Sequence, residues 1–259
     1  MGTVVSFNDD ITERKKAERS LRRSNRALQA LSAANEALVC ATDEATLLQE
    51  VCRIAVEVGD YRVAFVGFAE DDAEKTVSIA AQHGAEMGYL ESLGFTWADT
   101  DKGQSTVGRA IRSGVAQMSQ NIMTDPKLAP WYAAVARLGS RASISLPLKA
   151  KDGKVFGMLT IGAAETDAFD ADEVKLLGGL AADLAFGIEA LRTRAERDRI
   201  AHQHAHHAEI LQKSLEKFIQ AIADTVEARD PYTAGHQRRV DELATAIARE
   251  LGLAEDKIH

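Results

Sequence analysis

Two pairs of β-rich segments define the middle of the chain. In the first pair, residues 61–69 and 76–81 are separated by a short polar segment, which is typical of two antiparallel strands. In the second pair, residues 142–149 and 154–161 flank an Asp-Gly dipeptide, which strongly favours a tight hairpin turn. These four segments predict the main strands of an antiparallel sheet.

Segments with helical spacing surround and separate these strands. An apolar helical face follows a capping residue at Asp43 and ends at Gly59. Between the two strand pairs, we expect a helix at 105–112, a short strand at 115–119, and a helix that begins at Asp125 with proline in its first position. An antiparallel sheet with helices grouped on its faces is an α+β fold.

A heptad-like repeat precedes this region. Over residues 11–41, apolar positions recur at the spacing of a coiled coil, so this segment is predicted to be a linker helix that pairs with a second copy. The predicted seam consists of Leu21, Leu28, Leu31, Asn35 and Leu38. Asn35 either specifies register and a two-stranded pairing or faces solvent where the supercoil has ended.

A second long helix is predicted over residues 170–228. Asp170 and Glu173 have the three-residue spacing of a capping box at its start. Its heptad-like positions are Leu177, Leu184 and Leu191 in the first half, and Leu211, Leu215, Phe218 and Ile222 in the second. The two halves are out of phase by one residue, which predicts a local change of supercoil near residues 192–204. We expect this helix to continue the dimer seam as an exit helix for a signal.

Two groups of residues within this helix are candidates for further roles. Gly178-Gly179 costs helix propensity, about 1 kcal/mol for each glycine, and we interpret it as close packing of the helix against the sheet. His202, His204, His206 and His207 form a histidine cluster. His202 and His206 share one helical face and are candidates for a metal or a pH sensor, and the alternative is a polar stretch of coiled coil.

Composition and charge narrow the class of protein. With 259 residues, 46% hydrophobic and 27% charged, the chain is typical of one or two soluble globular domains. The net charge of −8 disfavours a nucleic-acid partner, and the basic stretch at residues 14–26 is interpreted as a solvated helix face. Since no apolar run reaches the roughly 20 residues needed to span a bilayer, we expect a cytoplasmic protein without a membrane segment. Cys40 and Cys52 are expected to be buried apolar residues rather than a disulfide.

Several motifs of the middle region, in this order, resemble those of GAF domains. They are Tyr61-Arg62-Val63-Ala64-Phe65-Val66-Gly67, Thr106-Val107-Gly108-Arg109-Ala110-Ile111-Arg112-Ser113-Gly114, Asn121-Ile122 with Asp125-Pro126, Ser145-Leu146-Pro147-Leu148, and Gly157-Met158-Leu159-Thr160-Ile161. The resemblance implies a GAF core over residues 42–169, with an antiparallel sheet flanked by helices. It also implies a pocket for a small ligand.

The segments that wall this pocket in GAF domains supply the candidate ligand-binding residues. They are Trp97, Asp125, Trp131, Tyr132, Ser143 and Ser145. Amphipathic aromatic rings and hydroxyl groups suit such a cavity, and the alternative is that both tryptophans close the edge of the core. No cysteine between Gly59 and Leu191 is available for a bilin, and no Asn-Lys precedes Phe169 as in cyclic-nucleotide GAF domains. The ligand is therefore unidentified.

Both ends of the chain resemble parts of other signalling domains. Residues 1–10, with the β-favouring run at 4–7 and the following Asp10-Ile11-Thr12, resemble the last strand of a truncated PAS domain. Residues 229–259 contain Arg229-Asp230-Pro231-Tyr232-Thr233-Ala234-Gly235-His236 and resemble the start of a truncated HD-GYP domain, a class of cyclic di-GMP phosphodiesterase. This resemblance makes His236 the first ligand of an incomplete metal site, and it implies divalent iron or manganese for a complete HD-GYP domain. No cofactor is expected in this chain itself.

The favoured hypothesis is a regulatory module. A homodimeric GAF sensor would bind a small ligand and transmit the signal through a coiled coil to an HD-GYP-type output domain. One alternative is a metal-dependent phosphohydrolase that is active in its own right, although no complete catalytic set occurs in the sequence, and we expect this chain to be inactive alone. A further alternative is a transcription regulator, with residues 240–258 as the first half of a helix-turn-helix.

Overall fold

The computed structural model describes residues 4–229 and 234–253 of the chain. It contains two units, Met1–Arg194 and Ala195–His259, and the long helix α6 (Ala171–Arg229) belongs to both. Before α6, the first unit comprises α1 (Val4–Cys40), α2 (Glu44–Glu57), β1 (Val63–Ala69), β2 (Val77–His83), α3 (Tyr89–Ser92), η1 (Lys102–Gln104), α4 (Thr106–Ser113), β3 (Gln117–Ser119), η2 (Ile122–Thr124), η3 (Pro126–Trp131), α5 (Tyr132–Leu138), β4 (Ala142–Lys149) and β5 (Val155–Ala163). The elements labelled η are short 3-10 helices.

Five strands form an antiparallel sheet in the order β2-β1-β5-β4-β3. The two predicted strand pairs are the hairpins β1–β2 and β4–β5, and β3 is the short strand expected between them. At the centre of the sheet, Thr160 of β5 lies opposite Phe65 of β1 on one side and Ser145 of β4 on the other. The predicted α+β fold is confirmed.

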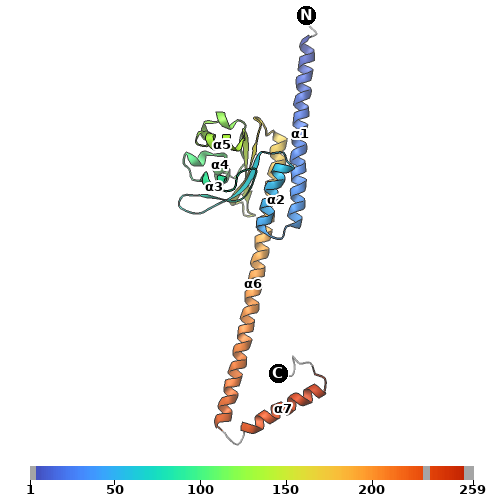
Figure 1. Cartoon of the computed structure of the whole chain (residues 1–259), viewed down its shortest axis with the longest axis vertical. Helices are drawn as coiled ribbons and strands as arrows, with labels where there is room; N and C mark the ends of the chain where they lie inside the picture. Colours follow the sequence, from blue (N-terminus) through green and yellow to red (C-terminus); the bar gives the residue numbers. More distant parts are fainter. Residues whose placement is uncertain (1–3, 230–233, 254–259) are drawn as a thin grey trace. The chain divides into compact units, whose positions relative to one another are not determined.

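Different helices cover the two faces of this sheet (Figure 1). The first face packs against α1, α2 and the beginning of α6, and it carries the larger hydrophobic core cluster. The second face lies under α3, α4 and α5 and carries two smaller clusters. Successive residues of a strand point to opposite faces, so Ile144 and Leu146 of β4 enter the first core while Ser143 and Ser145 face the second.

The predicted capping residues begin their helices as expected. A side-chain oxygen of Asp43 accepts from the backbone N–H of Thr46 at 2.9 Å, and Asp170 accepts in the same way from Glu173 at 2.9 Å. Asp125 accepts from the N–H of the second residue after it at 3.1 Å, although the segment that it starts is the 3-10 helix η3. These bonds satisfy N–H groups that have no partner within the first helical turn.

The predicted strand at residues 4–7 is wrong, because helix α1 already begins at Val4. β-branched residues favour a strand only where a neighbouring strand can pair with them. No described strand of the sheet pairs with this segment, and the helical segment after it continues without a break.

The first long helix contacts its own GAF core through buried alanines and through part of the predicted seam. Ala27, Ala30 and Ala34 are buried, and Leu31 and Leu38 pack partly against the same core. The other predicted seam residues of α1 are Leu21, Leu28 and Asn35, which are all exposed. This second group is exposed and available to a second copy.

The first half of α6 also packs against the core of its own chain, although its leucines were predicted to form the dimer seam. Leu177 and Leu184 are fully buried in the core of their own chain, and Leu191 packs against it. Over three heptads, an apolar stripe that faces a sheet has the same spacing as one that faces a partner helix. The predicted close packing of Gly178-Gly179 against the sheet is also wrong, because a Cβ added at Gly178 would meet nothing within 4 Å. The close approach is instead at Gly187, where an added Cβ would lie 2.0 Å from Cδ1 of Leu38.

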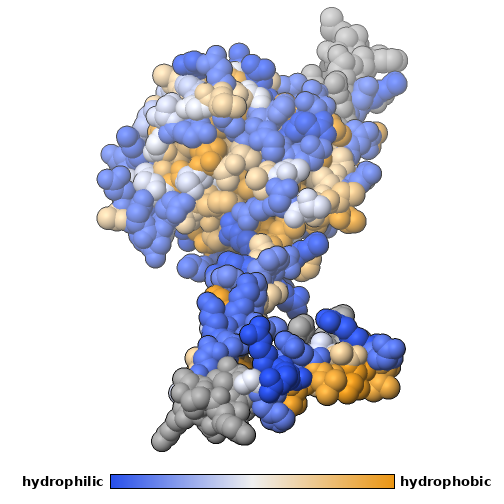
Figure 2. Space-filling model, turned by 60° about the horizontal axis from the view of Figure 1, so that its bottom comes forward, coloured by the Kyte–Doolittle hydropathy of each residue, from blue (hydrophilic) through white to orange (hydrophobic). Residues whose placement is uncertain are grey.

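In the second unit, α6 continues from Ala195 and is followed by α7 (Ala234–Glu250). The predicted seam positions in this half of α6 are all exposed: Leu211, Leu215, Phe218 and Ile222. Figure 2 shows apolar side chains gathered on α7, where Val240, Leu243 and Ile247 have helical spacing and are exposed. None of the described helices has the length and apolar character that a membrane crossing requires.

Candidate functional site

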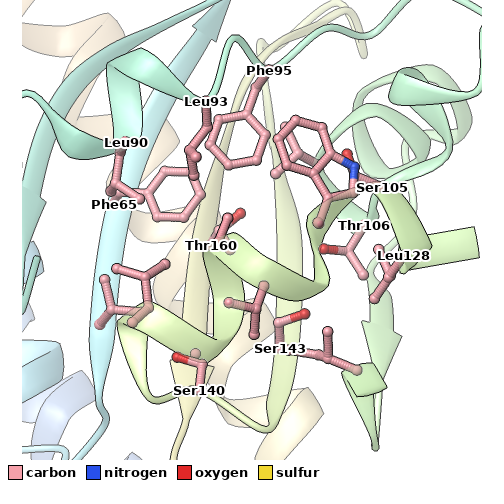
Figure 3. A pocket seen from close by; sticks show the side chains of 18 residues that line it. Phe65, Leu90, Leu93, Phe95, Ser105, Thr106, Leu128, Ser140, Ser143 and Thr160 are labelled. Carbon is pink, nitrogen blue, oxygen red and sulfur yellow. The ribbon is translucent and has the colours of Figure 1, made fainter. Parts of the chain in front are cut away.

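A cavity of about 60 Å³ lies on the second face of the sheet, under α5 and the segments before it. Its apolar wall includes Phe65, Leu90, Leu93 and Phe95, and its hydroxyl groups come from Ser105, Thr106, Ser140, Ser143 and Thr160 (Figure 3). The close-up shows Phe65, Leu90, Leu93 and Phe95 along one side and the hydroxyls of Ser140 and Ser143 along the other, with Leu128 beside Thr106. A mainly apolar cavity with a few polar groups is the usual form of a small-ligand site.

Three stacked aromatic rings form one wall of the cavity. The ring of Phe95 lies 5.5 Å from that of Phe65 and 4.8 Å from that of Trp131, with interplanar angles of 23° and 15°. Trp131 is 6% exposed, and its Nε1 is buried without a hydrogen-bond partner among the described residues. The stack fixes the plane of the indole, and the indole N–H has no acceptor among the described residues.

A network of hydroxyl groups borders another part of the cavity. Ser145 Oγ donates to Thr106 Oγ1 at 3.0 Å and lies 2.8 Å from Thr160 Oγ1. The strand register explains this group, because Ser145 and Thr160 are direct neighbours across β4 and β5, and α4 lies over them. Ser140 Oγ is also buried and has no partner among the described residues.

Part of this site was predictable from the sequence. Trp131 and Ser143 line the cavity, and Ser145 lies behind them in the hydroxyl network. Asp125 instead caps η3, and its backbone oxygen accepts from the Tyr132 hydroxyl at 3.0 Å, so this pair holds the segment beside the cavity.

Trp97 lies outside the cavity. Its Nε1 donates to the backbone oxygen of Glu70 at 3.0 Å, and the Nζ of Lys75 lies 4.7 Å from its ring centroid. This tryptophan closes the edge of the smaller core, as the alternative interpretation proposed.

Several lining residues were missed, for different reasons. Phe65, Thr106 and Thr160 occur within the quoted motifs, and strand alternation places Thr160 on the same face as Ser143, so these could have been predicted. Phe95 and Ser140 lie in segments without a periodic pattern, and no local signal identifies them.

A buried charged cluster lies on the other face of the sheet, where α1 meets α6. Glu173 Oε1 accepts from the Tyr61 hydroxyl at 2.6 Å and from Arg26 Nε at 3.0 Å, and the Arg26 guanidinium lies 4.6 Å from the Tyr61 ring centroid. Burial raises the pKa of Glu173 despite its two donors, and burial together with the Glu173 charge raises the pKa of Tyr61. The sequence pattern indicates only the helix-capping role of Glu173.

The described residues contain no cluster of three or more side chains that could hold a metal ion. His236 is exposed on α7, and residues 230–233 of its motif lie outside the described residues. His202, His204, His206 and His207 are also exposed, and His202 Nδ1 lies 2.8 Å from the backbone oxygen of Asp198. His236 therefore stays a single candidate ligand.

The two cysteines do not contribute to the cavity. Burial raises the pKa of the Cys52 thiol to about 12, so this residue is an unreactive core residue, as expected. Cys40 differs from the prediction, since it is exposed at the end of α1.

Comparison with known proteins identifies the family. Residues 41–189, more than half of the chain, match the GAF domain family, and the chain therefore belongs to it. It contains a GAF domain of the sensor or regulatory type. The matched range includes every strand of the sheet and the first part of α6.

Three individual relatives extend this result. The "Methyl sulfide methyltransferase-associated sensor" of Methanosarcina acetivorans is 24% identical over 96% of this chain, which spans only 23% of the length of that sensor. The GAF domain of a Coxiella burnetii phosphoenolpyruvate-protein phosphotransferase has a TM-score of 0.55 at 18% identity, covering 67% of this chain and 98% of its own. Free methionine-R-sulfoxide reductase from Neisseria meningitidis, in complex with its substrate, has a TM-score of 0.54 at 18% identity, covering 65% and 91%. The two structures are similar to this chain in fold.

Proposed function

We propose that this chain is the sensor part of a homodimeric signalling protein, in which a small ligand in the cavity changes how the long helices pair. The ligand side and the helix side of the domain share the same strands. In this scheme the ligand shifts the population of two helix arrangements by binding one of them more tightly.

The observation that carries this proposal is the alternation of residues along β4 and β5. Ser143 and Thr160 line the cavity, while their neighbours Ile144, Leu159 and Ile161 lie in the core that contacts the helices. Packed cores have discrete arrangements and deform little, so a displacement on the cavity face is transmitted to the helix face.

Three contacts attach the long helices to each other and to the core. Arg26 of α1 pairs with Glu173 of α6, and Leu38 of α1 packs at Gly187 of α6. Near the end of the first unit, Arg192 donates to both carboxylate oxygens of Glu44 at 2.7 and 2.6 Å. A change in the sheet would therefore reach α1 and α6 together.

The dimer would form through the apolar positions that the chain itself leaves exposed. On α1 these are Leu21 and Leu28, and on the second half of α6 they are Leu211, Leu215, Phe218 and Ile222. Exposed apolar stripes at heptad spacing are typical of coiled-coil seams. Asn35, also exposed, would set the register.

For the output we propose an HD-GYP-type cyclic di-GMP phosphodiesterase after α6, and a PAS domain before α1. The support is the sequence of residues 229–236 at one end and residues 10–12 at the other. In a complete HD-GYP domain, His236 would hold iron or manganese together with residues from elsewhere in that domain. The curated relative, itself described as a sensor, supports the sensory role but not this output.

Native mass spectrometry of the purified chain tests the sensor proposal. We expect a dimer at low micromolar concentration that retains a small molecule, and we expect loss of that molecule in Ser143→Leu, which fills the cavity. Ser78→Leu is the matched control, because Ser78 lies on β2 and does not line the cavity. A monomeric chain would contradict the dimer, and equal retention in both variants would contradict the cavity as the site.

The competing hypothesis, an enzyme active in its own right, is tested on the same material. Cyclic di-GMP hydrolysis by this chain with manganese or iron, abolished in His236→Ala, would replace the sensor proposal. A DNA-binding regulator predicts salt-dependent binding to DNA, since phosphate contacts release counterions. We expect neither activity.

A further inference from the structure

We propose that the ligand of the cavity is a small uncharged molecule with a mainly apolar body and a hydrogen-bond acceptor that pairs with Nε1 of Trp131. This inference rests on the proposed sensing function of the same cavity and specifies the chemical class of its ligand. Three properties of the wall carry it: its lack of charge, its unpaired donor and its size.

The wall carries no formal charge. Among the described residues, its lining consists of apolar side chains, hydroxyl groups and the Trp131 indole, without an acidic, basic or histidine side chain. An ion that leaves water without an opposite charge to pair with pays a large desolvation penalty. Carboxylates, phosphates and ammonium groups are therefore disfavoured, and with them cyclic nucleotides.

The indole of Trp131 requires an acceptor. Its N–H can only donate, and Nε1 is buried without a partner among the described residues. The stack with Phe95, at 4.8 Å, keeps the ring from turning toward solvent. A buried donor without a partner is destabilising, so a ligand oxygen or nitrogen that accepts this hydrogen gains affinity.

A second polar point is available at Ser140. Its Oγ is buried, lines the cavity and lacks a partner among the described residues. Because a hydroxyl can donate or accept, it accommodates either kind of polar atom and does not define the ligand on its own. Trp131 thus selects the acceptor, and Ser140 supports a second contact.

The size of the cavity limits the ligand. Because a single water needs roughly 10–15 Å³ and an apolar cavity of about 150 Å³ holds benzene, a cavity of about 60 Å³ admits only a small ligand. A five-membered ring with one substituent is a compact body that can carry a neutral acceptor, no acceptor or a charge. Cyclopentanone, methylenecyclopentane and cyclobutanecarboxylate therefore form a matched set of probes: a neutral acceptor, the same shape without an acceptor, and a charged analogue.

The experiment uses the indole N–H signals in two-dimensional proton–nitrogen NMR spectra of the full chain. The chain has two tryptophans, and Trp97 is an internal control because its Nε1 already donates to Glu70. We expect cyclopentanone to move the Trp131 signal and leave that of Trp97 in place. We expect methylenecyclopentane to bind more weakly and cyclobutanecarboxylate not to bind.

Trp131→Phe removes the N–H and keeps an aromatic ring. Loss of one hydrogen bond should weaken cyclopentanone binding roughly 2- to 12-fold and leave methylenecyclopentane unaffected. If this variant does not fold, Ser140→Ala serves as the second variant, with a smaller loss for cyclopentanone only.

The outcomes separate this inference from the proposed function. Carboxylate binding as tight as that of the ketone would overturn the uncharged class while leaving a sensing cavity. Equal binding of cyclopentanone and methylenecyclopentane to the wild type would overturn the role of Trp131, and the sensing function would again be unaffected. If no probe shifts any signal from the cavity, this inference fails, while the sensing function is decided separately by retention of a small molecule in native mass spectrometry.

Discussion

The buried ion pair between Arg26 and Glu173 gives the strongest test of how the first long helix is attached to the GAF core. Arg26 Nη2 lies 3.0 Å from Glu173 Oε1, and Tyr61 donates to the same oxygen at 2.6 Å. The Glu173 side chain is fully buried, and that of Arg26 is 16% exposed. Replacing Arg26 by methionine would leave the buried carboxylate with Tyr61 as its remaining donor in this cluster.

The expected cost follows from this burial. Removing one partner of a buried ion pair costs about 3–5 kcal/mol, because the other charge remains unpaired. Since Tyr61 still donates to Glu173, we expect Arg26→Met to lower the free energy of unfolding by the lower limit, about 3 kcal/mol. The double variant Arg26→Met, Glu173→Leu leaves no unpaired charge, but the Tyr61 hydroxyl loses its acceptor, so this variant should lose only about 1 kcal/mol.

Urea unfolding of the four proteins of this double-mutant cycle, followed by circular dichroism, measures the coupling. Arg53→Met is the matched control, because Arg53 forms ion pairs with Glu50 and Glu57 on the surface of α2 and its loss should shift the midpoint little. The reasoning is refuted if Arg26→Met costs no more than Arg53→Met, or if the double variant is less stable than either single one.

Three further predictions concern the same helices. Burial raises the pKa of Glu173 above its usual value of 4.5, so the folded state binds its proton more tightly than the unfolded state. The wild type should therefore lose stability relative to Glu173→Gln as the pH rises above 4.5, and urea titrations that show the opposite trend would mean that attraction to Arg26 outweighs burial. Gly187→Ala should lower the melting temperature, at a net cost of about 1 kcal/mol, because the added methyl group meets Leu38. Gly178→Ala should raise the melting temperature, because alanine gains about 0.5–1 kcal/mol in helix propensity and meets no neighbour. Equal effects of the two substitutions would contradict the close packing of Gly187 against Leu38. Phe218→Glu places a charge in the proposed α6 seam and should convert the dimer into a monomer by light scattering, and an unchanged dimer would place the interface elsewhere.

The sheet could be predicted from the sequence because its signals are local. Alternating residues, an Asp-Gly turn and capping side chains act over a few residues, and all four main strands lie where these signals place them. The predicted strand at residues 4–7 is wrong because a strand needs a pairing partner, which no local pattern reveals. Leu177 and Leu184 of α6 are buried in their own chain and do not lie in the predicted dimer seam. The reason is related, because periodicity defines an apolar face but not what covers it.

The cavity could be predicted only in part. Trp131 and Ser143 belong to segments that the family resemblance places at the pocket, and both line it. Trp97 and Tyr132 have the same chemistry, but their polar atoms bond to backbone oxygens outside the cavity. Side-chain direction in irregular segments depends on tertiary packing, which composition and spacing do not encode.

Tyr61 connects the two faces of the domain over a short stretch of chain. Its hydroxyl donates to Glu173 near the start of α6, and four residues later Phe65 stacks in the cavity wall. Phe65 also lies opposite Thr160 in the sheet, so in the proposed mechanism a ligand that contacts both residues would act on β1 and β5 together. Because the Tyr61–Glu173 bond is buried and shared with Arg26, a displacement of β1 would reach α1 and α6 at once. We therefore propose that an uncharged ligand on one face of the sheet is coupled to the charged contact on the other.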